Sequence, residues 1–197
     1  MPRPRIDEQA VRDRIIEIAE TLLIESSGRR LVLSDIAARM GVSQPYVYRH
    51  FKNKDALVAE LARRWFEKVE EDGENICNSS QSWQDKLRTY VLSMLQLKRK
   101  AYDANPELFA AYLRFAESHG AVVEQHIKVL VDQIRRILVS SVPENDLENI
   151  VNLVLDATVQ FRVPAAIMSA PLNATPQRAK PVLNAIIEYI ERRGKSE

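Results

Sequence analysis

Residues 44–50 combine polar and aromatic side chains of the types that bind nucleic acids. The heptapeptide QPYVYRH contains one glutamine, two tyrosines, one arginine and one histidine. Amide and guanidinium groups form hydrogen bonds with base edges, whereas hydroxyls and ring nitrogens contact phosphates. An exposed helix more commonly carries Glu and Lys at such positions. This heptapeptide is therefore a candidate surface for binding nucleic acid.

Two short helices are predicted to present this surface. Ser34 is a good N-cap for the first helix. Gly41 is expected to end that helix because glycine tolerates a left-handed backbone. Ser43 then caps the second helix, and Pro45 is tolerated in its first turn. Two helices joined by so tight a turn form a helix-turn-helix signature.

The second of these helices has two distinct faces. At 3.6 residues per turn, Val47 and Phe51 share an inward face. The outward or flanking residues are Gln44, Pro45, Tyr46, Tyr48, Arg49 and His50. Asn53 is a candidate cap for the next helix, whose free N–H groups would bind a phosphate together with Lys54. Such a clamp would fix register without reading sequence.

The segment GVSQPYVYRHFKNKDAL, preceded by LSDIAARM, resembles the DNA-binding segment of the TetR family of transcriptional regulators. The resemblance covers roughly residues 10–60 and includes the pattern Y-x-H-F-x-N-K-x-x-L. It implies that residues 44–50 form a recognition helix and that Lys54 clamps a phosphate. With the two capping serines, the predicted DNA-binding residues are Ser34, Ser43, Gln44, Pro45, Tyr46, Tyr48, Arg49, His50 and Lys54.

Composition is ordinary for a globular protein and limits the possible functions. The chain has 197 residues, of which 46% are hydrophobic, and a formal net charge of +1. DNA affinity must therefore come from the local placement of charge rather than from a basic stripe. Arg3 and Arg5 are candidates for a flexible arm along DNA, or equally for a solubilising tail. Without a long apolar run or the apolar core of a signal peptide, we expect a cytoplasmic protein with no membrane contact.

Helical periodicity along the whole chain predicts an all-α fold. The expected helices span about 7–26, 34–40, 43–51, 54–72, 83–104, 106–119, 120–141, 144–170 and 181–190, with a loop at 72–82. Pro164 should interrupt its helix near Gln160. A turn is expected at 171–180, although Thr175 and Pro176 are also compatible with an early helical turn. We divide the chain into a three-helix helix-turn-helix unit, 1–55, and a helical ligand-binding and dimerisation domain, 56–197.

The second domain contains aromatic and polar residues at helical spacing. The candidate ligand-binding residues are Trp65, Tyr90, Met94, Tyr112, Phe115, Gln160, Phe161 and Arg162. Taken singly, each of these residues is better explained as an ordinary core residue. As a group they are stronger candidates for a ligand site, because Asp156, Gln160 and Arg162 interrupt an apolar helix and buried polar groups need partners. A pocket lined by these residues would bind a small, mainly hydrophobic molecule. Arg162 would pair with an acidic ligand, with Asp156 or with a partner subunit.

Enzyme chemistry has little support in the sequence. Neither a nucleophile elbow nor a phosphate-binding Gly loop nor H-E-x-x-H is present, so we predict no catalytic residue and no cofactor. Cys77 is the single cysteine, which excludes an internal disulfide. A metal site at His119 or His126 would need carboxylates such as Glu124 or Asp156 to converge on it, and we predict none.

Two apolar helices near the C-terminus, one of them apolar on more than one face, predict a homodimer through the last two helices. The family resemblance implies the same interface. Together these features predict a sequence-specific DNA-binding transcriptional regulator, favouring a ligand-responsive repressor that binds a palindromic operator on double-stranded DNA as a dimer. The alternative is a DNA-bound protein-interaction factor of the same fold without a small-molecule ligand.

Overall fold

The computed structural model describes residues 7–194 except Ser27, Arg29 and His119, and it also leaves out the side chains of residues 115, 117 and 118. Arg3 and Arg5 therefore lie outside the described residues. Every regular element within the described part is a helix, as the predicted all-α fold requires. None of the described helices is long and apolar enough to cross a membrane.

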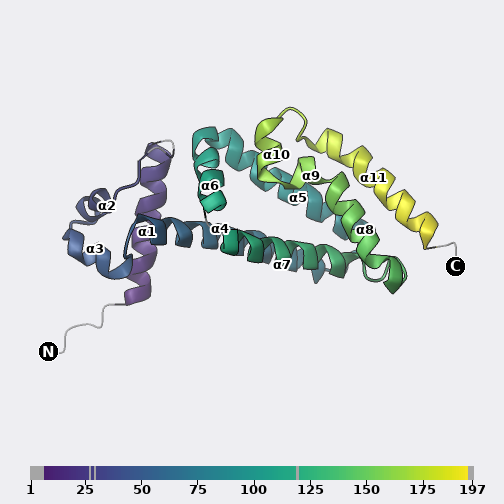
Figure 1. Cartoon of the computed structure of the whole chain (residues 1–197), viewed down its shortest axis with the longest axis horizontal. Helices are drawn as coiled ribbons and strands as arrows, with labels where there is room; N and C mark the ends of the chain where they lie inside the picture. Colours follow the sequence, from purple (N-terminus) through teal and green to yellow (C-terminus); the bar gives the residue numbers. More distant parts are fainter. Residues whose placement is uncertain (1–6, 27, 29, 119, 195–197) are drawn as a thin grey trace. The chain divides into compact units, whose positions relative to one another are not determined.

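The chain forms two compact units (Figure 1). The first comprises the residues up to Trp65 together with Asn105–His119, and the second comprises Phe66–Ala104 and Gly120–Glu197. Helix α4 (Lys54–Cys77) begins in the first unit and continues into the second. The predicted functional division after residue 55 stays a prediction, and the first compact unit extends beyond it because Leu57 and Leu61 of α4 are part of its core.

The first unit contains α1 (Glu8–Glu25), α2 (Leu33–Met40), α3 (Gln44–His50), the start of α4, and α6 (Pro106–Ser118). The Asp7 carboxylate caps α1 by accepting the N–H of Gln9 at 3.0 Å. The core of this unit consists of Ile15, Ile16, Ile18, Ala19, Leu23, Leu31, Leu33, Ile36, Ala37, Val47, Phe51, Leu57 and Leu61. The apolar side chains of α1 thus share one core with those of the two helices of the helix-turn-helix.

Ser34 was predicted to cap α2, and that prediction is wrong. The helix begins one residue earlier, at Leu33, with Val32 in the N-cap position and no side-chain cap. The physical reason is that Leu33 is buried in the core, which brings its backbone into the first turn. Ser43 does occupy the N-cap position of α3, although its hydroxyl makes no capping hydrogen bond.

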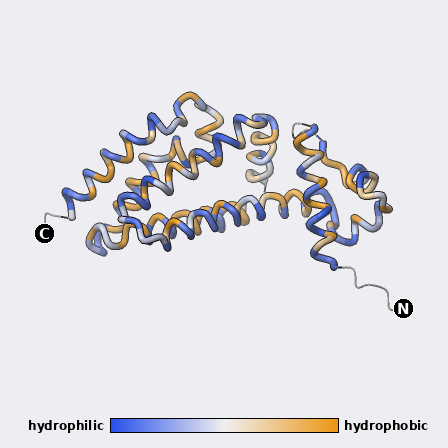
Figure 2. The backbone as a smooth tube through the Cα atoms, turned by 180° about the vertical axis from the view of Figure 1, so that it is seen from behind, coloured by the Kyte–Doolittle hydropathy of each residue, from blue (hydrophilic) through white to orange (hydrophobic). Residues whose placement is uncertain are grey.

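The second unit is arranged around α5 (Trp83–Ala104). This helix packs against α7 (Gly120–Leu138), α9 (Val159–Arg162), α10 (Pro164–Ser169) and α11 (Pro176–Arg193), while α8 (Glu144–Ala157) packs against α7. Hydrophobic and hydrophilic residues alternate along these helices, as expected where one face of each is buried (Figure 2). Between α8 and α10 the chain leaves regular helix at Thr158 and at Val163, which confirms the interruption predicted around Gln160.

Three details of the second unit differ from the sequence-based expectations. The predicted loop 72–82 is shorter, because α4 continues to Cys77 and its polar residues find partners on α7. Helix α11 begins at Pro176 with Thr175 as its cap, which is the alternative start that the sequence allowed, so Pro181 lies inside the helix rather than at its start. Apolar periodicity along residues 120–141 favours an inward-facing Ile127, but this side chain is 52% exposed, whereas His126 and Gln133 of the same helix are buried.

Gly41 offers a direct test of how α2 ends. Its φ is 68°, and an added Cβ would meet nothing within 4 Å, so replacement by alanine introduces backbone strain alone. We expect Gly41→Ala to lower the free energy of unfolding by roughly 1–2 kcal/mol, measured by urea denaturation. Gly120→Ala is the matched control, since its Cβ also meets nothing within 4 Å and its φ is not positive. Equal stabilities of the two variants would contradict the left-handed cap.

Candidate nucleic-acid interface and ligand site

Two buried side chains hold helix α3 on the first unit. Val47 and Phe51 are buried in the core, as the helical wheel predicted. Four predicted DNA-binding residues on the other side of the helix are exposed, and two are half-buried. The exposed ones are Gln44, Pro45, Tyr48 and Arg49, and the half-buried ones are Tyr46 and His50. The predicted surface is therefore available to a partner along most of α3.

Tyr46 organises part of that surface. The guanidinium carbon of Arg49 lies 4.8 Å from the centroid of the Tyr46 ring, an arrangement favoured by cation–π attraction. The rings of Tyr46 and His50 meet edge to face, with centroids 5.3 Å apart and planes at 60°. The Tyr46 ring therefore contacts both Arg49 and His50 and helps to orient their side chains.

Arg12 of α1 supports α3 in a way that sequence reasoning missed. Its Nη1 donates a hydrogen bond to the backbone carbonyl of His50 at 2.5 Å, and its guanidinium carbon lies 4.3 Å from the Phe51 ring centroid. A cation at the C-terminal end of a helix also interacts favourably with the free carbonyls there. Residues 12 and 50 are 38 positions apart in the chain, so no sequence pattern predicts this contact and only the fold reveals it.

The start of α4 is the place predicted for a phosphate clamp, and the clamp itself stays a prediction. The Oδ1 of Asn53 accepts the N–H of Ala56 at 2.8 Å, which confirms Asn53 as the cap. Lys54 is the first residue of α4 and is exposed. Ser34 is half-buried and donates its hydroxyl to Asp35 at 3.5 Å, so its side chain has a partner within the protein.

The eight candidate ligand-binding residues are divided between the two compact units. Trp65 and Tyr112 belong to the first unit, and Tyr112 packs against its core. The side chain of Phe115 lies outside the described part. The five residues of the second unit are Tyr90, Met94, Gln160, Phe161 and Arg162. Their role as a ligand site stays a prediction.

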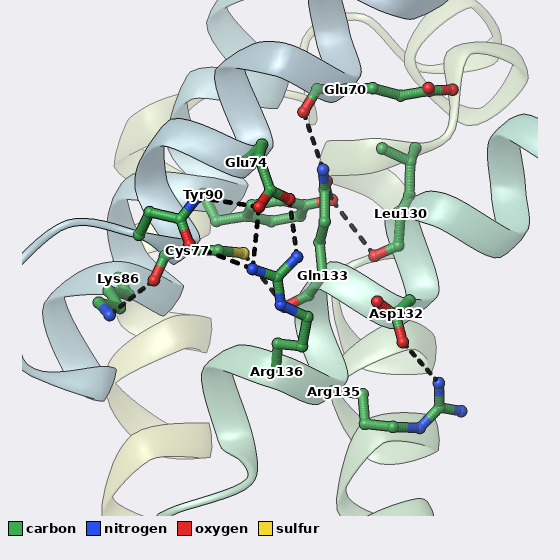
Figure 3. Close-up of polar contacts among 11 residues, drawn as sticks. Glu70, Glu74, Cys77, Lys86, Tyr90, Leu130, Asp132, Gln133, Arg135 and Arg136 are labelled. Atoms are coloured by element: carbon green, nitrogen blue, oxygen red, sulfur yellow. Dashed lines mark hydrogen bonds and ion pairs between the residues drawn. The ribbon is translucent and has the colours of Figure 1, made fainter.

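Tyr90 is the centre of a buried hydrogen-bond network in the second unit (Figure 3). Its hydroxyl donates to the Oε1 of Gln133 at 3.0 Å, and the Nε2 of Gln133 donates to the backbone carbonyl of Glu70 at 2.8 Å. Burial raises the pKa of Tyr90 above its usual value, so the hydroxyl stays protonated and can donate. Gln133 fits because Gly73 has no side chain, since a Cβ there would lie 2.2 Å from Oε1.

Gln160 and Arg162 bind backbone groups near the helix interruptions. The amide of Gln160 donates to the carbonyl of Ala166 at 2.9 Å. Arg162 donates through Nε to the hydroxyl of Thr158 at 2.7 Å and through Nη2 to the carbonyl of Leu155 at 2.8 Å. Burial lowers the pKa of Arg162. Asp156, one partner considered for Arg162 from the sequence, forms no described ion pair with it.

Lys98 is a buried polar residue that the sequence analysis did not single out. Only 2% of its surface is exposed, and its Nζ donates to the backbone carbonyl of Arg162. Burial, followed by the nearby Arg162 charge, lowers the pKa of Lys98 to about 7. The sequence signal that could have found it is Pro164, which interrupts the helix and leaves carbonyls without an internal partner.

His126 is also buried and makes a specific pair. Its Nδ1 lies 2.6 Å from a carboxylate oxygen of Glu70, and its ring stacks on Phe66 with centroids 4.2 Å apart. Burial lowers the pKa of His126, while the Glu70 carboxylate acts in the opposite direction. Within the described part of the chain, no three His, Cys, Asp or Glu side chains are grouped as a metal site requires. His119 lies outside that part.

Tyr90→Phe tests the network in the second unit. The variant leaves the buried Oε1 of Gln133 without its described donor, so we expect a loss of about 1–3 kcal/mol in the free energy of unfolding. Chemical denaturation measures this loss. Tyr48→Phe is the control, because Tyr48 is exposed at the surface of α3 and its hydroxyl makes no described hydrogen bond. A Tyr90 variant as stable as the wild-type protein would show that the network adds no stability.

The chain is similar to known regulators in both sequence and fold. The family model described as "Bacterial regulatory proteins, tetR family" matches residues 15–61, and "Tetracyclin repressor-like, C-terminal domain" matches residues 84–183. HTH-type transcriptional regulator TtgR of Pseudomonas putida is 32% identical over 80 residues, which are 41% of this chain and 36% of TtgR. Probable HTH-type transcriptional regulator ArpR of Pseudomonas putida is 33% identical with the same coverage. The match therefore spans about a third of the length of these curated relatives.

Two solved structures from Thermus thermophilus share the fold. One is FadR, a TetR family transcriptional repressor in complex with lauroyl-CoA, with a TM-score of 0.59 and 14% identity over 90% of this chain and 93% of FadR. The other is the TetR family transcriptional regulator PfmR, with a TM-score of 0.51 and 22% identity over 92% of this chain and 95% of PfmR. At these identities, the similarity concerns the fold alone.

Proposed function

Because the chain belongs to the TetR family of transcriptional regulators, we propose that it binds a specific DNA operator and represses transcription until a small ligand releases it. The observation that carries this proposal is the outer face of α3. Gln44, Tyr48 and Arg49 are exposed on a helix that Val47 and Phe51 fix to the core. A helix held in this way can enter a major groove and contact base edges.

The operator is proposed to be a palindrome read by a homodimer. Two recognition helices related by a two-fold axis require half-sites about one DNA turn, ~34 Å, apart. We assign the interface between the two copies to α8 and α11. Each of these helices carries a large side chain open to solvent, Leu153 at 37% and Tyr189 at 44% exposure, as a self-complementary surface would need.

The ligand is proposed to bind the helical C-terminal domain and to be small and mainly hydrophobic. FadR, which shares the fold, was solved with lauroyl-CoA, a molecule with a long apolar chain. Such a ligand would release DNA by binding more tightly to a state whose recognition helices are wrongly spaced. The proposed role includes no enzymatic activity and places the protein in the cytoplasm.

Capture of fragmented genomic DNA by the purified protein tests this function. We expect a short palindrome to be enriched and to survive rising salt, because base contacts add to the phosphate contacts that salt weakens. Capture of all fragments alike, lost together as salt rises, would refute sequence-specific binding. Operator binding that no apolar small molecule relieves would instead favour a factor that acts through another protein.

Tyr46→Ala should weaken operator binding selectively. The substitution removes a predicted DNA-contacting side chain and the ring that orients Arg49, a candidate for contacting base edges, so we expect a loss of roughly 1–3 kcal/mol for the operator. Binding to unrelated DNA and the free energy of unfolding should change little, because Val47 and Phe51 remain in place. Fluorescence anisotropy with both DNAs measures the selectivity. Unchanged operator affinity would exclude Tyr46 from the recognition surface.

Lys54→Ala should weaken binding to every sequence alike. Loss of one phosphate contact lowers affinity without changing specificity and reduces the slope of log affinity against log salt by about one. Affinities measured over a series of salt concentrations give this slope. Lys100→Ala is the control, because Lys100 is exposed on α5. A loss confined to the operator would contradict the clamp.

A further inference from the structure

The second compact unit contains two buried cationic residues close to each other. Lys98 on α5 is 2% exposed, and its Nζ donates to the backbone carbonyl of Arg162 on α9. The guanidinium of Arg162 binds the Thr158 hydroxyl and the Leu155 carbonyl. All of these acceptors are uncharged, so both cations lack a countercharge among the groups they contact.

No described carboxylate contacts this pair. Within the part of the chain that the structure describes, no Asp or Glu forms an ion pair with Lys98 or Arg162. Glu70 is paired with His126 at 2.6 Å. The exposed Asp156 carboxylate acts to raise the pKa of Arg162, but burial outweighs it and lowers that pKa. Burying a charge is costly unless an opposite charge accompanies it, and two neighbouring cations increase that cost. An anion placed here would relieve it.

The two side chains also retain hydrogen-bond donors for an anion. An ammonium has three N–H groups, and the described contacts of Lys98 use one of them. The described bonds of Arg162 use Nε and Nη2, which leaves Nη1 without a described acceptor. Every buried side-chain nitrogen or oxygen of the described residues has a hydrogen-bond partner. Since Nη1 has none, it must be accessible to solvent. A guanidinium edge and an ammonium together suit the two oxygens of a carboxylate.

We propose that the ligand of this regulator is an organic acid whose carboxylate binds the ammonium of Lys98 and the guanidinium of Arg162. The inference rests on the proposed function, since it specifies the head group of the ligand proposed there. It also separates two roles of Lys98. Supporting the end of α9 needs a single N–H, which a neutral amine supplies, whereas binding a carboxylate favours the ammonium.

Binding should therefore be linked to proton uptake. The charged or titratable groups that interact electrostatically with Lys98 are Arg162 from α9 and His126 from α7, and His126 is paired with Glu70 from α4. With its pKa near 7, Lys98 is partly neutral at pH 7, and an incoming carboxylate favours the protonated form. Affinity should be greatest below the Lys98 pKa and should fall as the pH rises above it.

Isothermal titration of the full-length protein with decanoate and 1-decanol tests the head group at constant chain length. We expect decanoate to bind at least about tenfold more tightly than decanol. Titrations at pH 7 in phosphate and Tris buffers, which differ in ionisation enthalpy, should show net proton uptake when decanoate binds.

Two variants and one control isolate the contribution of Lys98. Lys98→Met should lose the tenfold preference and the proton uptake, while its affinity for decanol stays unchanged. Lys98→Arg keeps a permanent charge, so it should retain decanoate binding and lose proton uptake. This variant still tests the role of Lys98 if the methionine variant does not fold. Lys100→Met, on the exposed side of the same helix, should behave as the wild-type protein does.

Equal affinities for decanoate and decanol would overturn the inference, as would failure of the wild-type protein to bind decanoate. Proton uptake that persists in either Lys98 variant would overturn it as well. The proposed function is tested separately, by operator capture with protein to which no organic acid has been added. Intact operator capture with no head-group preference would refute the organic-acid ligand but not the proposed regulatory function. Absence of operator capture would refute the proposed regulatory function itself.

Discussion

The burial of Val47 and Phe51 is the constraint on which the nucleic-acid surface depends. Helix α3 has seven residues, and so short a helix is not stable alone in water because nucleation is unfavourable. Full burial of a Val or Phe side chain contributes about 1.5–3 kcal/mol, and Arg12 adds a bond at the C-terminal end of the helix. Because both anchors lie on one face, they also determine which side chains remain outside. The stability of the helix and the composition of its outer surface therefore have the same origin.

In the second unit, the helix interruptions explain why polar residues occur in an apolar segment. Where the chain leaves regular helix at Thr158 and Val163, carbonyl groups lose their usual N–H partners. Side chains supply replacements, since Thr158 donates to the Val154 carbonyl at 2.6 Å and Gln160 donates to that of Ala166 at 2.9 Å. Lys98 does the same from a different helix. These residues stabilise the irregular backbone, and Lys98 and Arg162 bring basic groups into the interior.

Sequence reasoning succeeded where the determining interaction is local. The Val47 and Phe51 face, the Asn53 cap and the interruption near Pro164 depend on residues that are close together in the chain. It failed where the partner is distant. The polar stretch after Asp72 looked like a loop because its contacts on α7, such as the bidentate Arg136–Glu74 pair, join residues 62 positions apart in the chain. The contact between Arg12 and His50 was missed for the same reason, since periodicity carries no information about such pairs.

The fit between Gly73 and Gln133 links two positions whose substitutions cannot be independent. The amide of Gln133 occupies the volume where any side chain at residue 73 would begin, and it spans Tyr90 and the Glu70 backbone from that place. A mutation of Gly73 would displace the amide and leave its buried partners unsatisfied unless residue 133 became smaller and Tyr90 lost its hydroxyl. Divergent sequences of this fold should therefore vary at these three positions together, giving a covariation signal inside the protein core.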